Sequence, residues 1–297
     1  MLYPDYPFTS HYLDIQGHKL HYLDEGPRDG EVLVMLHGNP SWSFYYRKLV
    51  LALREKYRCI VPDHIGMGLS DKPANGNYDF LYSRRAEDLS ELLETLGLQQ
   101  NLTLVLHDWG GMIGMTYASY LPERIRRLIV LNTAAFHLPP VKPLPLSLKI
   151  SRIPIINAIL NQGLNAFCRG AVKYGVTRKP MAADVAAAYL APYDCWNSRR
   201  AVRKFVEDIP LRAADPGYKR LSYVAANLEK FQSLPMLICW GMRDFVFDEE
   251  FLDEWVLRFP DAELHRFADA GHYVLEDAAE QIVPLIKDFL MHYPIND

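Results

Sequence analysis

The sequence predicts an α/β protein with a mostly parallel sheet and helices on both faces of that sheet. Short apolar segments typical of buried strands alternate with amphipathic segments typical of helices. Such alternation indicates parallel strands joined by helical crossovers. It stops between residues 136 and 214, where we expect no strand, and then resumes. We therefore expect one α/β domain that contains a helical insertion.

The part of the chain before the insertion supplies six of the expected strands. Residues 12–15 and 19–23 flank Gln16 and Gly17 and predict a hairpin. Leucines in residues 84–96 recur at helical spacing and predict an amphipathic helix. The remaining strands are expected at residues 32–36, 59–61, 102–106 and 128–131, and the remaining helices at residues 43–54 and from Trp109 onward.

The part after the insertion brings the sheet to eight strands. Strands are expected at residues 236–240 and 263–267, and helices at residues 250–258 and 275–291. These segments again follow the alternation of strand and helix.

The insertion is interpreted as a cap. It is rich in proline near its start and has helical stretches at residues 155–167 and 184–189. A helical segment of this kind is expected over the C-terminal edge of the sheet, where parallel sheets bind their ligands. The predicted division is a core of residues 1–135 and 215–297 and a cap of residues 136–214.

Composition excludes several classes of protein. The 297 residues are 49% hydrophobic and 23% charged, with a formal net charge of −4 and no basic stripe for nucleic acid. Four dispersed cysteines fit neither a zinc site nor a disulfide scaffold, so we expect reduced thiols and a cytoplasmic protein. Neither a signal peptide nor an apolar run near the roughly 18 residues of a membrane span is expected.

The segment Val105-Leu106-His107-Asp108-Trp109-Gly110-Gly111 carries the main chemical signal. An apolar strand, a sharp turn and a helix that opens on small residues are typical of the nucleophile elbow of α/β-hydrolases. The elbow here holds Asp108 where serine hydrolases hold serine, which predicts attack by a carboxylate. The alternative is that Asp108 only caps the helix that begins at Trp109.

Two later residues complete a catalytic set with Asp108. Asp244 and His272 each follow a strand, in the order nucleophile, acid, histidine that this fold uses. Because Asp108 is ionised at neutral pH, its attack needs no base. We therefore assign His272 to the second half-reaction, as base on water or as a proton shuttle, and Asp244 to orienting its imidazole. Asn132 lies at a competing position for the acid, but an amide cannot take that role.

Two neutral donors are expected to hold an anion beside Asp108. The Asn39 side-chain amide follows the third strand, and the Trp109 indole N–H is next to the nucleophile. Together they could bind a halide or a carboxyl oxygen. The alternatives are a turn residue before Pro40 for Asn39 and core packing for Trp109.

The remaining histidines are given structural roles. His37 and His107 are expected to brace loops by hydrogen bonds, and His11, His18 and His21 are not expected to form a metal site. No metal and no cofactor is predicted.

The segments at residues 37–40, 63–71 and 107–111 resemble those of the haloalkane dehalogenases, and the resemblance covers nearly the whole chain. In that family an aspartate displaces halide, an Asn and a Trp hold the halide, and a histidine-activated water cleaves the ester. The resemblance implies these roles for Asp108, Asn39, Trp109 and His272.

Longer segments at residues 38–47, 132–139 and 239–248 are similar to the β-lactone decarboxylases of bacterial long-chain olefin biosynthesis. That resemblance implies cleavage of a cis-β-lactone with two long alkyl chains into an alkene and carbon dioxide. By it, Asp108 attacks the lactone, Asn39 and Trp109 stabilise oxyanion charge, and His272 with Asp244 turns the acyl-enzyme over. It also implies a small apolar substrate and assembly with other enzymes of the pathway. The apolar residues 138–156 suit a long apolar substrate, but they suit ordinary core packing equally.

The first hypothesis is thus cis-β-lactone decarboxylation, and the second is haloalkane dehalogenation with the same residues. Epoxide hydrolysis is a third, in which Tyr189 and Tyr193 would protonate the epoxide oxygen. A luciferase-like oxygenase and a non-catalytic scaffold are the remaining alternatives. The complete set of Asp108, Asp244 and His272 disfavours the scaffold.

Overall fold

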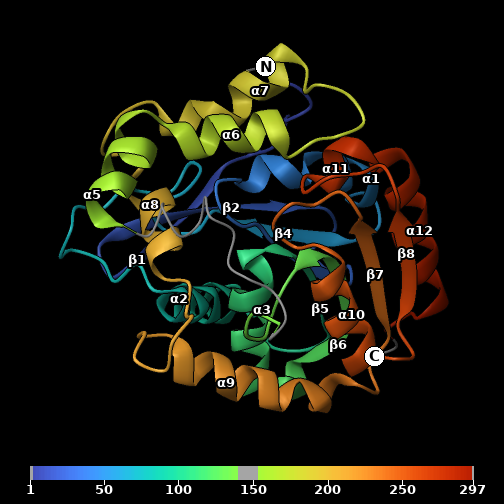
Figure 1. Cartoon of the computed structure of the whole chain (residues 1–297). Coiled ribbons are helices and arrows are strands. Elements are labelled where there is room, and N and C mark those ends of the chain that lie inside the picture. The colour runs from blue at the N-terminus through green and yellow to red at the C-terminus, as the bar shows by residue number, and fades with distance from the viewer. Residues whose placement is uncertain (1–2, 140–152, 296–297) are drawn as a thin grey trace.

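The computed structural model describes residues 3–139 and 153–295. Its centre is an eight-stranded sheet in the order β1-β2-β4-β3-β5-β6-β7-β8 (Figure 1). Strand β2 alone runs opposite to the direction of the other seven strands, so the predicted mostly parallel sheet is confirmed. The strands are β1 (His11–Ile15), β2 (His18–Glu25), β3 (Val32–Leu36), β4 (Arg58–Pro62), β5 (Leu102–Asp108), β6 (Ile125–Thr133), β7 (Met236–Gly241) and β8 (Glu263–Phe267).

Side chains of the central strands alternate between two buried layers. Leu33 and Met35 pack with α1 (Arg47–Leu53) and α12 (Ala279–His292) on one face. Val34 and Leu36 pack on the other face, in the same layer as side chains of three further helices. Because both faces are covered, the strands are apolar on both sides, which explains their continuous apolar sequences. The three helices are α2 (Tyr82–Thr95), α3 (Trp109–Tyr120) and α10 (Glu249–Arg258).

The described residues between β6 and β7 form helices and no strand, as predicted. The helical stretch predicted at residues 155–167 is confirmed as far as Gly163 and is interrupted at Leu164 and Asn165. Asn165 takes a left-handed conformation (φ 56°), which ends one helical segment and begins another. Most of the apolar opening at residues 138–156 lies outside the described residues. The helical segments are α5 (Pro154–Asn157), the π-helical turn η3 (Ala158–Gly163), α6 (Ala166–Tyr174), α7 (Ala183–Leu190), η4 (Ala191–Tyr193), α8 (Arg200–Glu207), α9 (Tyr218–Asn227) and η5 (Leu228–Phe231).

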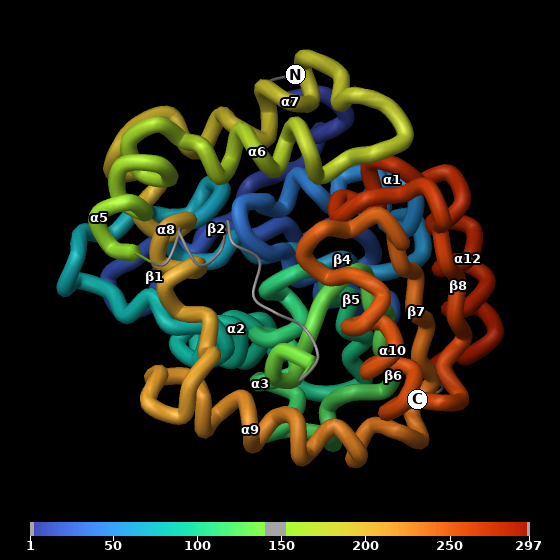
Figure 2. Tube along the Cα trace, in the orientation of Figure 1, coloured from blue at the N-terminus to red at the C-terminus, as the bar shows by residue number. Residues whose placement is uncertain are grey.

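Other predicted helices differ in detail. The helix expected at residues 275–291 is broken at Ala278, where φ is −133° and ψ is 21°, into α11 (Val274–Asp277) and α12. The helix expected at residues 43–54 begins as the 3-10 turn η1 (Ser43–Tyr46). Helices α8 and α9 were not predicted. Figure 2 shows α6 and α7 near the top of the molecule and α9 at the bottom.

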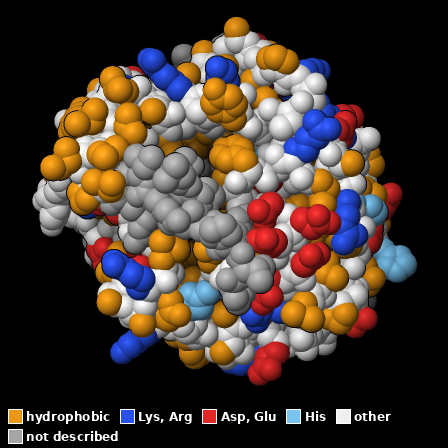
Figure 3. Space-filling model, viewed as in Figure 1, with side chains coloured by type: hydrophobic (Ala, Val, Ile, Leu, Met, Phe, Trp, Pro, Cys, Tyr) orange, Lys and Arg blue, Asp and Glu red, His pale blue; other side chains and the backbone are white. Residues whose placement is uncertain are grey.

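Some apolar side chains between β6 and β7 face solvent. Ile155, Ile159 and Leu164 are exposed. Figure 3 shows hydrophobic side chains gathered at the upper left of the molecule, where α5 lies in Figure 1. Within residues 3–139 and 153–295, no helix has both the length and the apolar character needed to cross a membrane.

Candidate active site

The nucleophile elbow forms at the end of β5. Asp108 is the last residue of that strand and has a φ of 50° and a ψ of −126°, a strained backbone for a residue with a side chain. Close packing around the turn requires glycine. A β-carbon on Gly110 would overlap the Leu36 carbonyl, and one on Gly38 would overlap the Asp108 carboxylate. The glycines therefore let two loops approach the reactive side chain.

The Asp108 carboxylate is buried, and its two oxygens differ. Oδ1 accepts a hydrogen bond from the backbone N–H of Asn39 at 2.6 Å. Oδ2 lies 3.8 Å from His272 Nε2, too far for a hydrogen bond. Burial raises the pKa of Asp108, while His272 and the backbone N–H groups of Asn39 and Trp109 oppose this rise. Oδ2 is therefore the oxygen available for attack.

His272 is held by Asp244, as the sequence analysis predicts. The Nδ1–H of His272 donates to Asp244 Oδ2 at 2.8 Å, and the Val246 N–H donates to the other Asp244 oxygen at 2.7 Å. Burial lowers the pKa of His272, but Asp244 and then Asp108 outweigh burial, so the pKa is raised above 6.5. The two carboxylates thus favour the cationic form of His272 more than water does for an ordinary histidine.

Asn132 is engaged elsewhere. Its Nδ2–H donates to the Gly241 carbonyl at 3.0 Å, and the Gly241 N–H donates back to its Oδ1 at 2.8 Å. This reciprocal pair joins the ends of β6 and β7. Asn132 therefore has a structural role in this geometry, and Asp244 occupies the acid position.

The two expected anion donors are arranged differently from each other. The Asn39 amide donates to the Val202 carbonyl of α8 at 3.1 Å, which leaves one of its two amide hydrogens uncommitted. The indole of Trp109 lines the cavity described below, and its N–H has no acceptor among residues 3–139 and 153–295. The Trp109 indole N–H is thus free to bind an anion, whereas the Asn39 amide is partly committed to Val202. Anion binding by the pair stays a prediction.

Asp108 and His272 open into a cavity of about 770 Å³. Its walls are mainly aliphatic and aromatic, with Phe136, Phe167 and Phe247 among them. Neither Tyr189 nor Tyr193, the tyrosines considered for epoxide hydrolysis, lines it. A mainly apolar cavity with a single carboxyl group at one end is suited to an uncharged, apolar substrate.

Comparison with known proteins agrees with this architecture. Residues 31–152 match the family model of the α/β hydrolase fold. A cis-3-alkyl-4-alkyloxetan-2-one decarboxylase from Shewanella oneidensis is 53% identical over 96% of this chain and 89% of its own length. The chain belongs to this decarboxylase family.

More distant relatives share the fold. Haloalkane dehalogenase 2 from Mycobacterium bovis is 33% identical over 95% of this chain and 94% of its own. A crystal structure of a loop variant of a haloalkane dehalogenase from Bradyrhizobium elkanii superposes with a TM-score of 0.85 at 23% identity, covering 96% of this chain and 97% of the other. The decarboxylase-family chain thus has the sheet and helices of the dehalogenases.

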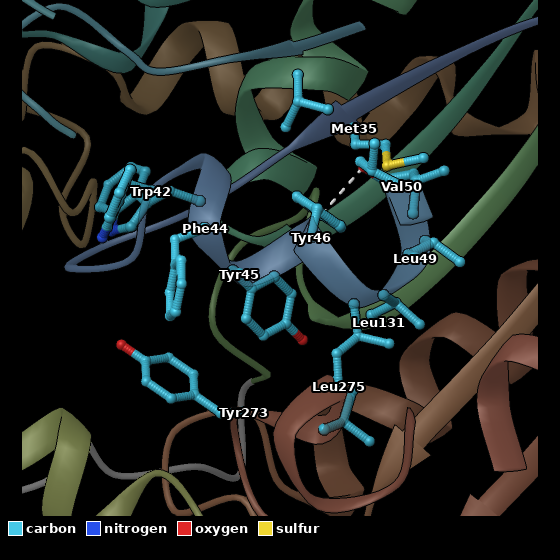
Figure 4. Packing of buried hydrophobic residues seen from close by; sticks show 14 of the residues in the cluster. Met35, Trp42, Phe44, Tyr45, Tyr46, Leu49, Val50, Leu131, Tyr273 and Leu275 are labelled. Atoms are coloured by element: carbon cyan, nitrogen blue, oxygen red, sulfur yellow. Dashed lines mark hydrogen bonds between the residues drawn. The ribbon is translucent and has the colours of Figure 1, made fainter. Parts of the chain in front are cut away.

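Two further histidines brace the site of this decarboxylase-family member, as expected. His107 donates from Nε2 to the His272 carbonyl at 2.9 Å, and its ring stacks on Tyr45 with centroids 4.2 Å apart. His37 donates from Nδ1 to the Gly38 carbonyl at 2.8 Å. Figure 4 shows Tyr45 packed near Tyr273, the residue that follows His272. Aromatic packing therefore supports the loop that carries His272.

The N-terminal histidines have separate partners. His21 binds Asp63 Oδ2 at 2.8 Å, His18 binds the Asn77 carbonyl at 2.9 Å, and the ring of His11 stacks on Tyr22. No cluster of metal-binding side chains occurs in the described part of the chain.

Proposed function

We propose that this chain is a cis-β-lactone decarboxylase that converts a cis-3-alkyl-4-alkyloxetan-2-one into an alkene and carbon dioxide. The observation that carries the proposal is a buried Asp108 carboxylate opening into an apolar cavity, in a chain 53% identical to a protein named for this reaction. An uncharged lactone with two alkyl chains fits such a cavity.

The reaction proceeds in two steps that balance without water. First, Asp108 Oδ2 bonds to ring carbon C4 and the bond from C4 to the ring oxygen breaks, which leaves an alkyl ester on Asp108 and a free carboxylate on C3. Second, the bond from C3 to this carboxylate breaks, and its electrons form the double bond between C3 and C4. The bond from C4 to Asp108 breaks at the same time, which releases alkene, carbon dioxide and the Asp108 carboxylate.

Two arguments favour C4 over the lactone carbonyl as the point of attack. The backbone N–H of Asn39, which would form part of an oxyanion hole, already binds Asp108 Oδ1. Carbonyl attack would also leave an alkoxide on C4, a poor leaving group for the elimination. Attack at C4 instead produces a carboxylate and an ester on adjacent carbons, the arrangement that decarboxylation needs.

The remaining residues stabilise charge in these steps. The Trp109 indole N–H, which lines the cavity, donates to the lactone carboxylate as it separates from C4. The His272 cation, positioned by Asp244, stabilises the Asp108 carboxylate when it departs. Because no water is consumed, His272 acts here through its charge, and the base role expected from the sequence belongs to the hydrolytic alternative.

Replacing His272 with Ala tests the covalent step. We expect an adduct on Asp108 with the mass of the whole lactone, because attack needs no base while expulsion of Asp108 is slowed. Intact-protein mass spectrometry after substrate addition detects it, and an Asp108→Asn control carries no adduct. Normal turnover by the His272→Ala variant without an adduct would contradict the mechanism.

Haloalkane dehalogenation is the second candidate, favoured by the 33% identical dehalogenase. The same Asp108 would displace halide, but the resulting ester would then need water activated by His272. Turnover in ¹⁸O-water separates the two reactions. Dehalogenation places ¹⁸O in the Asp108 carboxylate, whereas lactone decarboxylation leaves it unlabelled. Faster bromide release from a 1-bromoalkane than alkene release from a lactone would favour the dehalogenase.

Three wider aspects belong to the same proposal. Residues 136–214 act as a cap, supported by cavity-lining residues from α6 and α8. A cytoplasmic location is supported by four free cysteines, three of them buried. Work beside other enzymes of olefin biosynthesis is supported by the chemistry, since a strained lactone must be formed by a separate ring-closing reaction.

A further inference from the structure

One wall of the cavity is a helix with a glycine at its centre. The residues of α6 that line the cavity recur at helical spacing and form one face, with Gly170 between Ala166 and Tyr174. In Figures 1 and 2 this helix lies on the side of the molecule opposite α9. The cavity-lining residues of α6 are Ala166, Phe167, Gly170, Ala171 and Tyr174.

Neither the backbone nor close packing explains this glycine. Glycine inside a helix is less favourable than alanine, and Gly170 is not among the residues with a positive φ. At Gly38 and Gly110 an added β-carbon would collide with a neighbour. At Gly170 no atom of the described residues lies within 4 Å of such a β-carbon. The missing side chain therefore leaves space.

That space belongs to the substrate cavity and leads toward its mouth. Asp108 and Trp109 line the same cavity as Tyr174, and Tyr174 is 59% exposed. Phe245, after β7, also lines the cavity and is 55% exposed. The α6 face is thus an apolar wall of a cavity that reaches from the nucleophile to two exposed aromatic side chains.

We infer that Gly170 sets the length of one alkyl chain that the protein accepts. This inference rests on the proposed function, in which C3 and C4 of the lactone each carry a chain. A chain on the ring held at Asp108 lies along α6, and the missing side chain at Gly170 gives it room. A bulky residue there narrows the path for a long chain and leaves a short one unaffected.

The test compares the alkyl-chain-length profiles of the unmodified protein and three variants. For Gly170→Phe we expect kcat/KM to fall at least about tenfold for a lactone with two long chains and less than about threefold for one with methyl groups. Gly170→Ala adds only one carbon and should keep the wild-type profile. Arg169→Phe adds the same ring to an exposed position of α6 that does not line the cavity, and should also keep it.

Three outcomes are informative. An unchanged ratio of long-chain to short-chain kcat/KM in Gly170→Phe, or the same change in Arg169→Phe, would overturn the inference. If circular dichroism shows that Gly170→Phe does not fold, Ala166→Phe places the ring one turn earlier on the same wall and is expected to change the ratio likewise. If the wild type turns over no lactone, the proposed function fails, and calorimetric binding of primary alcohols of increasing length tests Gly170 independently.

Discussion

Replacing Asp244 with Asn should change both the rate and the pH dependence of the second chemical step. The Asp244 carboxylate accepts the Nδ1–H of His272 at 2.8 Å and is the largest influence that raises the pKa of this histidine. Asparagine keeps nearly the same shape but removes the charge. Burial, which lowers the pKa, remains, so we expect the pKa of His272 to fall and the cation to be less populated.

The size of the effect follows from burial of the pair. Both side chains are at most 5% exposed, and breaking a buried ion pair typically costs about 3–5 kcal/mol. If the cation is needed to expel Asp108 from the ester, the second step slows by roughly 10²- to 10⁴-fold, since each 1.36 kcal/mol is about a factor of ten. Attack by Asp108 does not use this cation, so the ester accumulates.

Single-turnover quench with intact-mass detection measures each step against pH. Adduct formation should fall as pH drops through the raised pKa of Asp108, because attack needs the ionised carboxylate. Adduct breakdown should be fast at low pH and fall as pH rises through the His272 pKa, which lies above 6.5. In Asp244→Asn this second fall should move to lower pH.

The opposite sign would refute the reasoning. If adduct breakdown is fast at high pH and lost as pH falls through the His272 pKa, then His272 is a base on water and the reaction is hydrolytic. A breakdown profile unchanged by Asp244→Asn would show that Asp244 does not control His272. Asp253→Asn, an exposed position on α10, serves as the matched control and should behave as wild type.

Two further predictions separate the neighbouring residues. Asn132→Ala should lower the free energy of unfolding by about 2 kcal/mol in urea titrations, because it loses two hydrogen bonds to Gly241; a shift of the adduct-breakdown pH profile would instead link Asn132 to His272. Trp109→Phe keeps an aromatic side chain but removes the indole N–H, so adduct formation in single-turnover experiments should slow by about 10²-fold. An unchanged rate would exclude Trp109 as an anion donor.

Most of the sheet could be predicted because its signals are local. Segments such as residues 32–36 and 102–106 are short and apolar throughout, as strands covered on both faces must be. The helix breaks at Asn165 and Ala278 could not be predicted in the same way. The Asn165 side chain donates to the Tyr193 carbonyl at 3.1 Å, a contact with a residue 28 positions later. No periodicity within residues 155–167 contains that information.

In the candidate site, too, features with a local sequence signal were predicted, and contacts between distant residues were not. The position of Asp108 was predicted by the glycines around it, and the pairing of Asp244 with His272 by their places after β7 and β8. The contact of the Asn39 amide with the Val202 carbonyl was not predicted, because the two residues are 163 positions apart. Anion binding by this amide stays a prediction. The backbone N–H of Asn39, which any residue except proline would offer, makes the contact with Asp108.

The residues around Asp108 do not by themselves distinguish a dehalogenase from a lactone decarboxylase, and the reason is chemical. A halide leaves the carbon skeleton, so the ester that remains can be opened only by water. A lactone carboxylate stays attached to C3, and its electrons expel Asp108 without water. The same carboxylate, histidine and acid therefore serve either reaction, and the substrate selects between them. Selectivity must then come from the apolar walls, where the space at Gly170 admits a long chain that a small haloalkane does not need.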